Sequence, residues 1–349
     1  MNRKKPQKKK VKKVVKKEVM DDFQPLVSVV LPFYNAPHLQ EAIESILDQT
    51  YANFELLLID NGSFDHSAEV AQTYARHAKV RLLNEPEKGV VFAANKGIAQ
   101  ANGDLIARMD ADDISNPERL ERQVEMFRNK PALSVVSGLV EYLGSPQNEG
   151  FLTYVDWLNS VKTTTDIWFN QFVEFPLANP SLMIRKEVFT QYGGYQEGDF
   201  PEDYEFFLRL QCAGVEMDKV DEVVLSWRDI PSRLTRTDSR YSQDAFFKVK
   251  AKYLALWLSA HNAFHPDIFI WGAGRLSRRR SEYLLNEGVN VVKYIDLKES
   301  DRVLHYTSIP APSEAFVVSY VGNRGVRSKI RNFLDQQGYK EGANYIMAS

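Results

Sequence analysis

Three aspartates stand at the end of the apolar run DLIARMD at 104–110: Asp110 is its last residue, and Asp112 and Asp113 follow it. The run is typical of a buried strand, so the carboxylates fall at a strand tip and not in the core. A D-x-D pair in a tight turn can hold a hard divalent cation, which prefers oxygen ligands and can bridge to substrate phosphates. The alternative is a solvated turn that caps a helix beginning near SNPERL at 115–120. The residues alone leave both interpretations open.

The elements around these aspartates alternate between short apolar runs and longer amphipathic stretches. We predict strands at 26–32, 54–60, 79–84 and 104–110, and helices at 38–50, 67–78 and 89–101. Such alternation is the signature of a mostly parallel α/β sheet with helices on both faces. Ligands of these sheets bind beyond the carboxyl ends of the strands, and Asn35, Asp60 and Asp110 fall at such ends.

Length and charge limit the class of protein. The chain has 349 residues, of which 44% are hydrophobic and 26% charged, as expected for two globular domains. Residues 1–22 hold ten Lys and Arg against three acids, so the formal net charge of -2 comprises about +7 there and -9 in the remainder. A mildly acidic body argues against nucleic acid as the main partner.

The cysteine count, the apolar stretches and the Lys-rich segment indicate the cellular compartment and the type of membrane contact. Cys212 is the only cysteine, which excludes an intramolecular disulfide, and no apolar stretch approaches the roughly 18 residues of a spanning helix. We therefore expect a cytoplasmic protein. The Lys-rich segment 1–22 is expected to be disordered on its own. It fits a solvated tail or a peripheral anchor to anionic lipid at the inner face of the membrane.

Four separated motifs carry a resemblance to a known family. The chain resembles, in the order and spacing of these motifs, the family 2 inverting glycosyltransferases of the GT-A fold, over residues 26 to about 235. The resemblance implies an α/β domain that transfers a sugar, with inversion, from a nucleoside diphosphate to an acceptor hydroxyl. The motifs are VSVVLPFYNAPHLQEAIESILDQTY, LLLIDNGSFDHS, NKGIAQANGDLIARMDADDISNPERLERQ and FPEDYEFFLRL.

The resemblance implies roles for individual residues. Asp60 matches the acid that accepts the ring N–H of the base, and Arg228 begins a basic stretch that can close over the donor diphosphate or simply be a solvated loop. Asp110 and Asp112 match the metal ligands, for Mn2+ or Mg2+. The implied nucleotide-sugar-binding residues are Pro32, Tyr34, Asn35, Asp60, Lys88, Gly89, Asn95, Asp110, Asp112 and Arg228.

The catalytic base is expected at the acid pair Glu202 and Asp203. An inverting transfer needs a carboxylate that takes the proton of the attacking hydroxyl, and the resemblance favours Asp203. The alternative is a pair of acids placed there by the dipole of a helix over 204–213.

The sequence indicates the sugar donor and the acceptor less precisely than the site residues. A UDP-sugar is our first expectation, although Asn61 stands where the family usually has a second aspartate, which weakens the argument for uracil. The Q-x-x-R-W signature of processive synthases is absent, which favours transfer of a single hexose-like sugar. We expect the acceptor to be a surface-glycan or glycolipid precursor.

The C-terminal part resembles a Rossmann unit. A strand, a G-x-G turn with Gly272 and Gly274, a helix and a strand ending in Asp296 follow one another, but Ser277 stands in place of the third glycine. We predict a basic tail at 1–22, a GT-A domain at 23–240, a linker helix at 241–265 and a Rossmann-like domain at 266–349. Two functions are alternatives to sugar transfer: an NAD-dependent oxidoreductase that uses this unit, and a non-catalytic scaffold.

Overall fold

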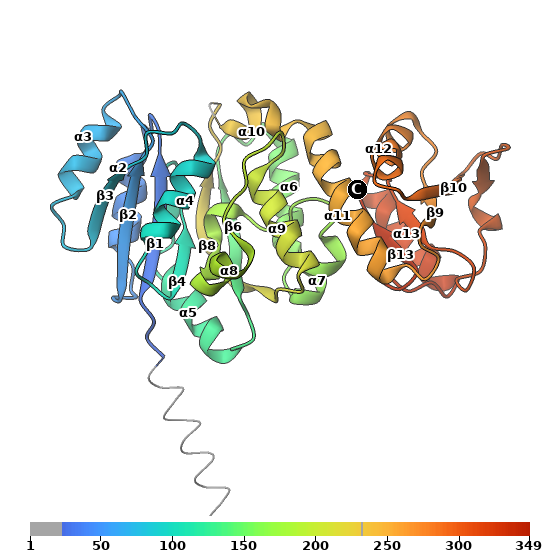
Figure 1. Ribbon diagram of the computed structural model, residues 1–349, viewed down its shortest axis with the longest axis horizontal. Helices are drawn as coiled ribbons and strands as arrows, with labels where there is room; N and C mark the ends of the chain where they lie inside the picture. Colours follow the sequence, from blue (N-terminus) through green and yellow to red (C-terminus); the bar gives the residue numbers. More distant parts are fainter. Residues whose placement is uncertain (1–22, 232) are drawn as a thin grey trace, which may run out of the picture.

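The computed structural model describes residues 23–231 and 233–349, and it contains two separate β-sheets (Figure 1). The larger, sheet A, has the strand order β3-β2-β1-β4-β7-β6-β8-β5. Its strands are β1 (Val27–Phe33), β2 (Phe54–Asp60), β3 (Val80–Asn84), β4 (Leu105–Arg108), β5 (Ile114–Ser115), β6 (Val135–Leu143), β7 (Met183–Arg185) and β8 (Met217–Arg228).

The first four strands of sheet A follow the predicted pattern. They run parallel to one another, because each is joined to the next by a helix that crosses back over the sheet. Beyond β4 the sheet becomes mixed, since β7 and β5 pair antiparallel with their neighbours. The predicted α/β class with a mostly parallel sheet is confirmed.

Helices cover both faces of sheet A. All seven residues of β1 are buried, with Val27, Val29 and Leu31 packed in one core and Val30 in the other. The helices of this half of the chain are α2 (Leu39–Leu47), α3 (Ser67–Tyr74), α4 (Val90–Gln100), α5 (Arg119–Asn129), α6 (Glu149–Ser160), α7 (Thr164–Asn170), α8 (Lys186–Tyr192), α9 (Glu202–Cys212) and α10 (Leu234–Thr237).

One glycine sets the distance between α4 and the sheet. A Cβ added to Gly97 would lie 2.5 Å from Val30 Cγ1 and 2.7 Å from Ile59 Cδ1, closer than side-chain atoms can approach. The helix can therefore lie directly on β1 and β2 only because this position has no side chain.

Sheet B is smaller and entirely parallel, in the order β11-β10-β9-β12-β13. Its first strand occupies the middle and the chain then builds outward on both sides, which is the doubly wound arrangement predicted for this region. Its elements are β9 (Asp267–Trp271), α12 (Arg275–Asn286), β10 (Asn290–Asp296), β11 (Val303–His305), β12 (Val317–Ser319), α13 (Arg324–Gln336) and β13 (Tyr345–Met347).

Helix α11 (Gln243–His261) lies between the two sheets (Figure 1). It packs against α9 on one side and α12 on the other, and one continuous core of buried residues runs from sheet A through Leu254 and Trp257 to Ile270 of β9. The region predicted as a linker is thus a buried helix that joins the two units. The division of the chain into domains stays a prediction, and the basic segment 1–22 lies outside the described residues.

Candidate active site

A cavity of 1320 Å³ opens at the carboxyl ends of β1 and β4. Its volume exceeds the usual range of small-molecule sites, so it has room for more than one substrate. Nine of the residues predicted to bind donor or metal, or to catalyse, lie in its wall: Pro32, Tyr34, Asn35, Lys88, Gly89, Asp110, Asp112, Glu202 and Asp203.

The three aspartates after β4 gather at one side of this cavity. Asp110, Asp112 and Asp113 each offer a carboxylate oxygen, and these atoms all lie within 4.8 Å of one another. Burial, and then the charge of Asp110, raise the pKa of Asp112. Asp113 Oδ2 is buried without a hydrogen-bond partner among the described residues. A crowded set of carboxylates with an unsatisfied oxygen fits a divalent cation.

Helix capping does not explain the aspartates. Helix α5 begins at Arg119, and the side chain that contacts its start is Asn116, whose Oδ1 accepts the N–H of Glu118 at 3.1 Å. Asp110 instead forms an ion pair of 2.8 Å with the buried Arg108. The solvated-turn alternative is therefore the weaker of the two.

Arg228 lies behind the aspartates and not in the cavity wall, contrary to the role expected for it. Its Nε donates to the main-chain oxygen of Asp112 at 2.7 Å, and its own N–H donates to Asp113 Oδ1 at 2.8 Å. Its Nη2 pairs with Glu41 at 2.7 Å. Arg228 holds the D-x-D loop in place from the last position of the long strand β8.

The loop before α4 forms the opposite wall. Lys88 Nζ lies 4.2 Å from the ring centroid of Tyr34 and donates to the main-chain oxygen of Asn61 at 2.9 Å. The Asn61 amide donates to the carbonyls of Glu85 and Glu87, and its oxygen accepts the N–H of Gly89 at 2.8 Å. The departure from the family's aspartate thus has a structural reason, since a carboxylate could not donate either bond.

Asn35 connects two loops at the mouth of the cavity. It has a left-handed backbone with φ 47°, which asparagine tolerates better than most residues. Its Oδ1 accepts the N–H of Phe64 at 3.0 Å, and its N–H donates to Ser63 Oγ at 3.1 Å. This clamp fixes the loop that carries Tyr34.

Two further predicted residues are not part of the wall. Asp60 accepts the N–H of Ser63 at 2.8 Å and shapes the turn behind Asn61. Asn95 faces away from the cavity, where its amide exchanges two hydrogen bonds with the main chain of Tyr195, at 2.8 and 3.0 Å. The structure supports a positioning function for both residues.

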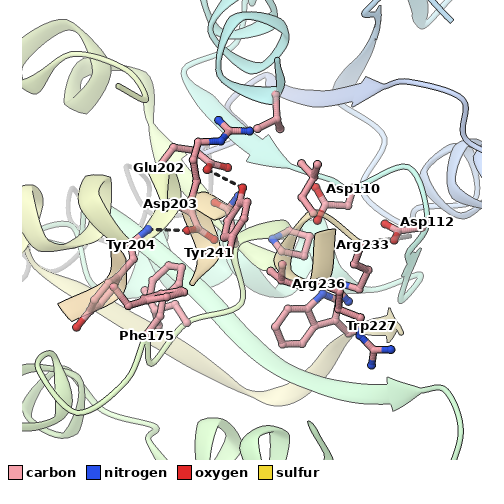
Figure 2. Close-up of a pocket in the computed structure, with 18 of the residues that line it drawn as sticks. Asp110, Asp112, Phe175, Glu202, Asp203, Tyr204, Trp227, Arg233, Arg236 and Tyr241 are labelled. Carbon is pink, nitrogen blue, oxygen red and sulfur yellow. Dashed lines mark hydrogen bonds between the residues drawn. The ribbon is translucent and has the colours of Figure 1, made fainter. Parts of the chain in front are cut away.

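The acid pair at the start of α9 separates into two environments (Figure 2). Glu202 is 5% exposed and accepts the hydroxyl of Tyr241 at 2.6 Å. Asp203 lies in the cavity wall, where its Oδ1 accepts the N–H of Tyr204 at 2.7 Å. Burial, followed by the charge of Glu202, raises the pKa of Asp203 to about 8.

The sequence did not reveal the aromatic wall, although Arg233 belongs to the basic stretch that it predicted near the donor diphosphate. Phe151, Tyr154 and Trp227 form an aromatic side, and the Arg233 guanidinium lies 4.8 Å from the Trp227 ring. Arg108 could have been noticed as a charge inside an apolar strand, but the aromatic residues carry no pattern that separates them from core. The far end is lined by residues of α11, α12 and α13.

Comparison with known proteins agrees with this geometry. Residues 28–193 match the model of glycosyl transferase family 2. The O-antigen biosynthesis glycosyltransferase WbnJ of Escherichia coli is 29% identical over 208 residues, 58% of this chain and 79% of that protein. The putative glycosyltransferase EpsE of Bacillus subtilis is 41% identical over 116 residues, 32% of this chain and 42% of that one.

A solved structure shares the fold. TarS 1–349 of S. aureus, in complex with UDP-GlcNAc, has a TM-score of 0.52 at 16% identity, covering 74% of this chain and 70% of that one. Together with the family match, the likeness confirms the GT-A fold that the motifs implied. The match to glycosyl transferase family 2 covers residues 28–193, just under half of the chain, and together with the similarity to named glycosyltransferases it identifies the chain as a glycosyltransferase.

Proposed function

We propose that the chain moves one sugar from a nucleoside diphosphate to an acceptor hydroxyl, with inversion at the anomeric carbon, and that Asp203 is the base. The observation that carries this proposal is the Asp203 carboxylate, which lies in one cavity with the D-x-D loop and whose pKa is raised to about 8. A single displacement needs one base and no nucleophile of the protein.

Asp203 is better suited to this role than Glu202. A general base needs one carboxylate oxygen that is free to face the substrate. Glu202 is buried with Tyr241 bound to it, whereas Asp203 is bound only by one main-chain N–H among the described residues. In the transfer, the acceptor oxygen bonds to the anomeric carbon, the bond to the diphosphate breaks, and Asp203 takes the hydroxyl proton.

We propose that Asp110 and Asp112, with Asp113 behind them, hold Mn2+ or Mg2+. Such an ion would neutralise the charge that develops on the leaving diphosphate. Lys88 and Tyr34 would bound the nucleotide on the other side, where the ring and the ammonium lie against each other. Arg233 and Arg236 line the same cavity and can add hydrogen bonds to phosphate oxygens.

The acceptor class and the setting of the enzyme are also proposals. WbnJ is named as a glycosyltransferase of O-antigen biosynthesis. For this chain we propose that the acceptor is a surface-glycan or glycolipid precursor. No helix within the described residues is long and apolar enough to cross a membrane. Location in the cytoplasm and attachment to anionic lipid through residues 1–22 stay predictions.

The Rossmann-like unit gives little support to an oxidoreductase. In sheet B the Asp296 carboxylate accepts the N–H of Ala273 at 2.7 Å, so a protein side chain takes an amide that a dinucleotide phosphate would need. The glycosyltransferase cavity is the better supported site.

A direct test measures nucleotide-sugar turnover with and without Mn2+. We expect release of nucleoside diphosphate from one sugar nucleotide of a panel, dependent on metal, and a product with inverted anomeric configuration by NMR. Retention of configuration would exclude the single displacement, and no metal-dependent release from any donor would favour the scaffold alternative.

A further inference from the structure

The active-site cavity continues from sheet A to the carboxyl edge of sheet B. Gly322 follows β12, Ser349 follows β13, and both line the cavity together with Arg280 of α12 and Arg327 of α13. This edge includes the point where the strand order of sheet B reverses, between β9 and β12. Ligands of doubly wound sheets bind at such a point.

Three cations meet at this end. Lys250 of α11 is 3% exposed and donates to the main-chain oxygens of Val173 and Ala348, at 3.1 and 3.2 Å. Arg327 is 5% exposed, and its Nε donates to the main-chain oxygen of Ser349 at 2.7 Å.

Arg280 completes this basic cluster. Its Nη1 donates to Ser349 Oγ at 2.7 Å, and its guanidinium lies 3.9 Å from the ring centroid of Phe247. Apart from the Ser349 main-chain oxygen, all the partners that the structure gives to Lys250, Arg280 and Arg327 within the described residues are neutral groups.

The charges of the cluster are not balanced by nearby acids. Glu174 is the acid whose charge opposes the lowering, by burial, of the pKa of Lys250 and of Arg327. It already forms an ion pair of 2.9 Å with Arg324. A carboxylate at Ser349 would still leave an excess of positive charge. Buried cations are normally paired, so this cluster calls for an anionic ligand.

The cations also affect one another. Burial and the Arg280 guanidinium, with a further effect of Arg327, lower the pKa of Lys250 to about 7, against an opposing effect of Glu174. Lys250 is therefore ready to take up a proton when a negative charge enters the cluster.

An aromatic wall connects the cluster to Asp203. Phe175 and Tyr204, whose ring centroids are 5.7 Å apart, lie beside Asp203 (Figure 2), and Tyr204 in turn contacts Phe246 at 5.5 Å. Phe175, Tyr204, Phe246 and Phe247 all line the cavity. Tyr204 is fully buried and Phe175 is 7% exposed, whereas Phe246 and Phe247 are partly exposed, so these two phenylalanines are the rings that a saccharide could contact between the base and the cations.

We propose that Lys250, Arg280 and Arg327 bind an anionic group, phosphate or carboxylate, on the saccharide acceptor. This inference rests on the proposed function, because it assigns the acceptor end of the same cavity. The donor diphosphate belongs to the other end, where the D-x-D loop and Lys88 lie. The C-terminal unit thus forms part of the acceptor site, and the enzyme selects acceptors that carry a negative charge.

The test titrates the full chain, in EDTA, with glucose 6-phosphate, glucuronate and glucose by calorimetry. We expect at least one of the charged sugars to bind, which identifies the anion, and glucose to bind much more weakly. Arg280→Met should weaken binding of the charged sugar by about 10–100-fold, the equivalent of one charge-assisted contact.

A matched control lies on the same helix. Arg275 is exposed and outside this cavity, so Arg275→Met removes the same charge from α12 and should leave binding unchanged. Arg280→Lys should recover part of the affinity. Equal binding of charged and neutral sugars, or an equal loss in Arg275→Met, would overturn the proposal.

Two further measurements separate this inference from the proposed function. UDP affinity in Mn2+ should be the same in wild type and Arg280→Met, and a loss of UDP binding would reassign the cluster to the donor. If the charged sugar binds but no sugar nucleotide does, the transferase proposal fails, and with it the assignment of the anion to an acceptor.

The pH dependence adds an independent readout. The carboxylate of glucuronate keeps its charge between about pH 6 and 9, whereas Lys250 loses its proton as the pH rises through its pKa of about 7. Binding of glucuronate should therefore weaken over this range, and a flat profile would remove Lys250 from the proposal.

Discussion

The carboxyl edges of the two sheets face the same cavity with opposite charge. Sheet A presents Asp110 and Asp112 after β4, whereas Arg280 and Arg327 lie beside the strand ends of sheet B. Both edges obey the rule that ligands collect where parallel strands end. The fold therefore determines where the two sites lie, and the charge of each site indicates which group of the substrates we expect it to bind.

The two edges also differ in whether their polar groups already have hydrogen-bond partners. At sheet A, Asp113 Oδ2 has no hydrogen-bond partner in the part of the chain that the structure describes, which is compatible with the proposed cation. At the glycine turn of sheet B, Asp296 already satisfies the N–H of Ala273. Nucleotide chemistry is therefore expected at the first edge and not at the turn of the second.

The largest expected effect comes from Asp203→Asn at the acidic edge. Asparagine keeps the shape but cannot take the proton, so kcat should fall by about 10²–10⁴-fold while donor and metal affinity remain. Steady-state kinetics at saturating donor, with calorimetry for donor affinity, measure the two quantities separately.

Glu202→Gln is the matched control, because it neutralises the neighbouring acid that Tyr241 binds. Its kcat should fall less than that of Asp203→Asn. A dead Glu202→Gln beside an active Asp203→Asn would transfer the role to Glu202, and two active variants would place the base elsewhere.

The sequence predicted the acidic edge far better than the basic one. The four apolar runs around Val29, Leu57, Leu82 and Ile106 predict the parallel part of sheet A, and the strand tips locate Asp110 without further information. Asp203 needed the family resemblance, since an acid pair at a helix start has an ordinary explanation in the helix dipole.

The predicted site residues that do not line the cavity have a common physical feature. Arg228 and Asn95 stand in matching positions of motifs, but their side chains turn to main-chain partners at Asp112 and Tyr195, which spacing does not reveal. The basic cluster comes from three different helices, α11, α12 and α13. The packing of α11 against α12, and the position of Arg327 close enough to affect the pKa of Lys250, cannot be predicted from the spacing of these residues in the sequence.

Asp112→Asn tests the metal at the acidic edge. Removal of one carboxylate should weaken Mn2+-dependent binding of UDP by about 10–100-fold or more, the scale of losses around metal sites. Calorimetry with and without Mn2+ measures the effect, and circular dichroism checks that the fold is intact. Unchanged Mn2+-dependent affinity would argue against the assignment of the metal to this loop.

The pH profile of kcat/KM should show the base directly. Because only the carboxylate form of Asp203 accepts a proton, activity should rise about tenfold per pH unit below its pKa of about 8 and level off above it. The pKa of Asp203 is raised by burial and by the charge of Glu202, so Glu202→Gln should shift the rising part of the profile to lower pH. A profile that is flat between about pH 6 and 9 in wild type would contradict the raised pKa.

The smallest effect on activity is expected from Asp296→Ala at the basic edge. Its carboxylate accepts the N–H groups of Ala273 and Leu297, both at 2.7 Å, and neither it nor Ala273 lines the cavity. The loss of both acceptors should lower the free energy of unfolding by about 0.5–1.5 kcal/mol, the net contribution of an ordinary hydrogen bond, because Leu297 is 74% exposed and water can replace its partner. Turnover of the donor should stay normal, because the turn contributes to the stability of sheet B and not to the transfer. Urea unfolding and steady-state kinetics on the same preparation measure both. If Asp296→Ala instead lost activity while remaining as stable as wild type, the glycine turn would have a functional ligand, and the contrast between the two edges would be wrong.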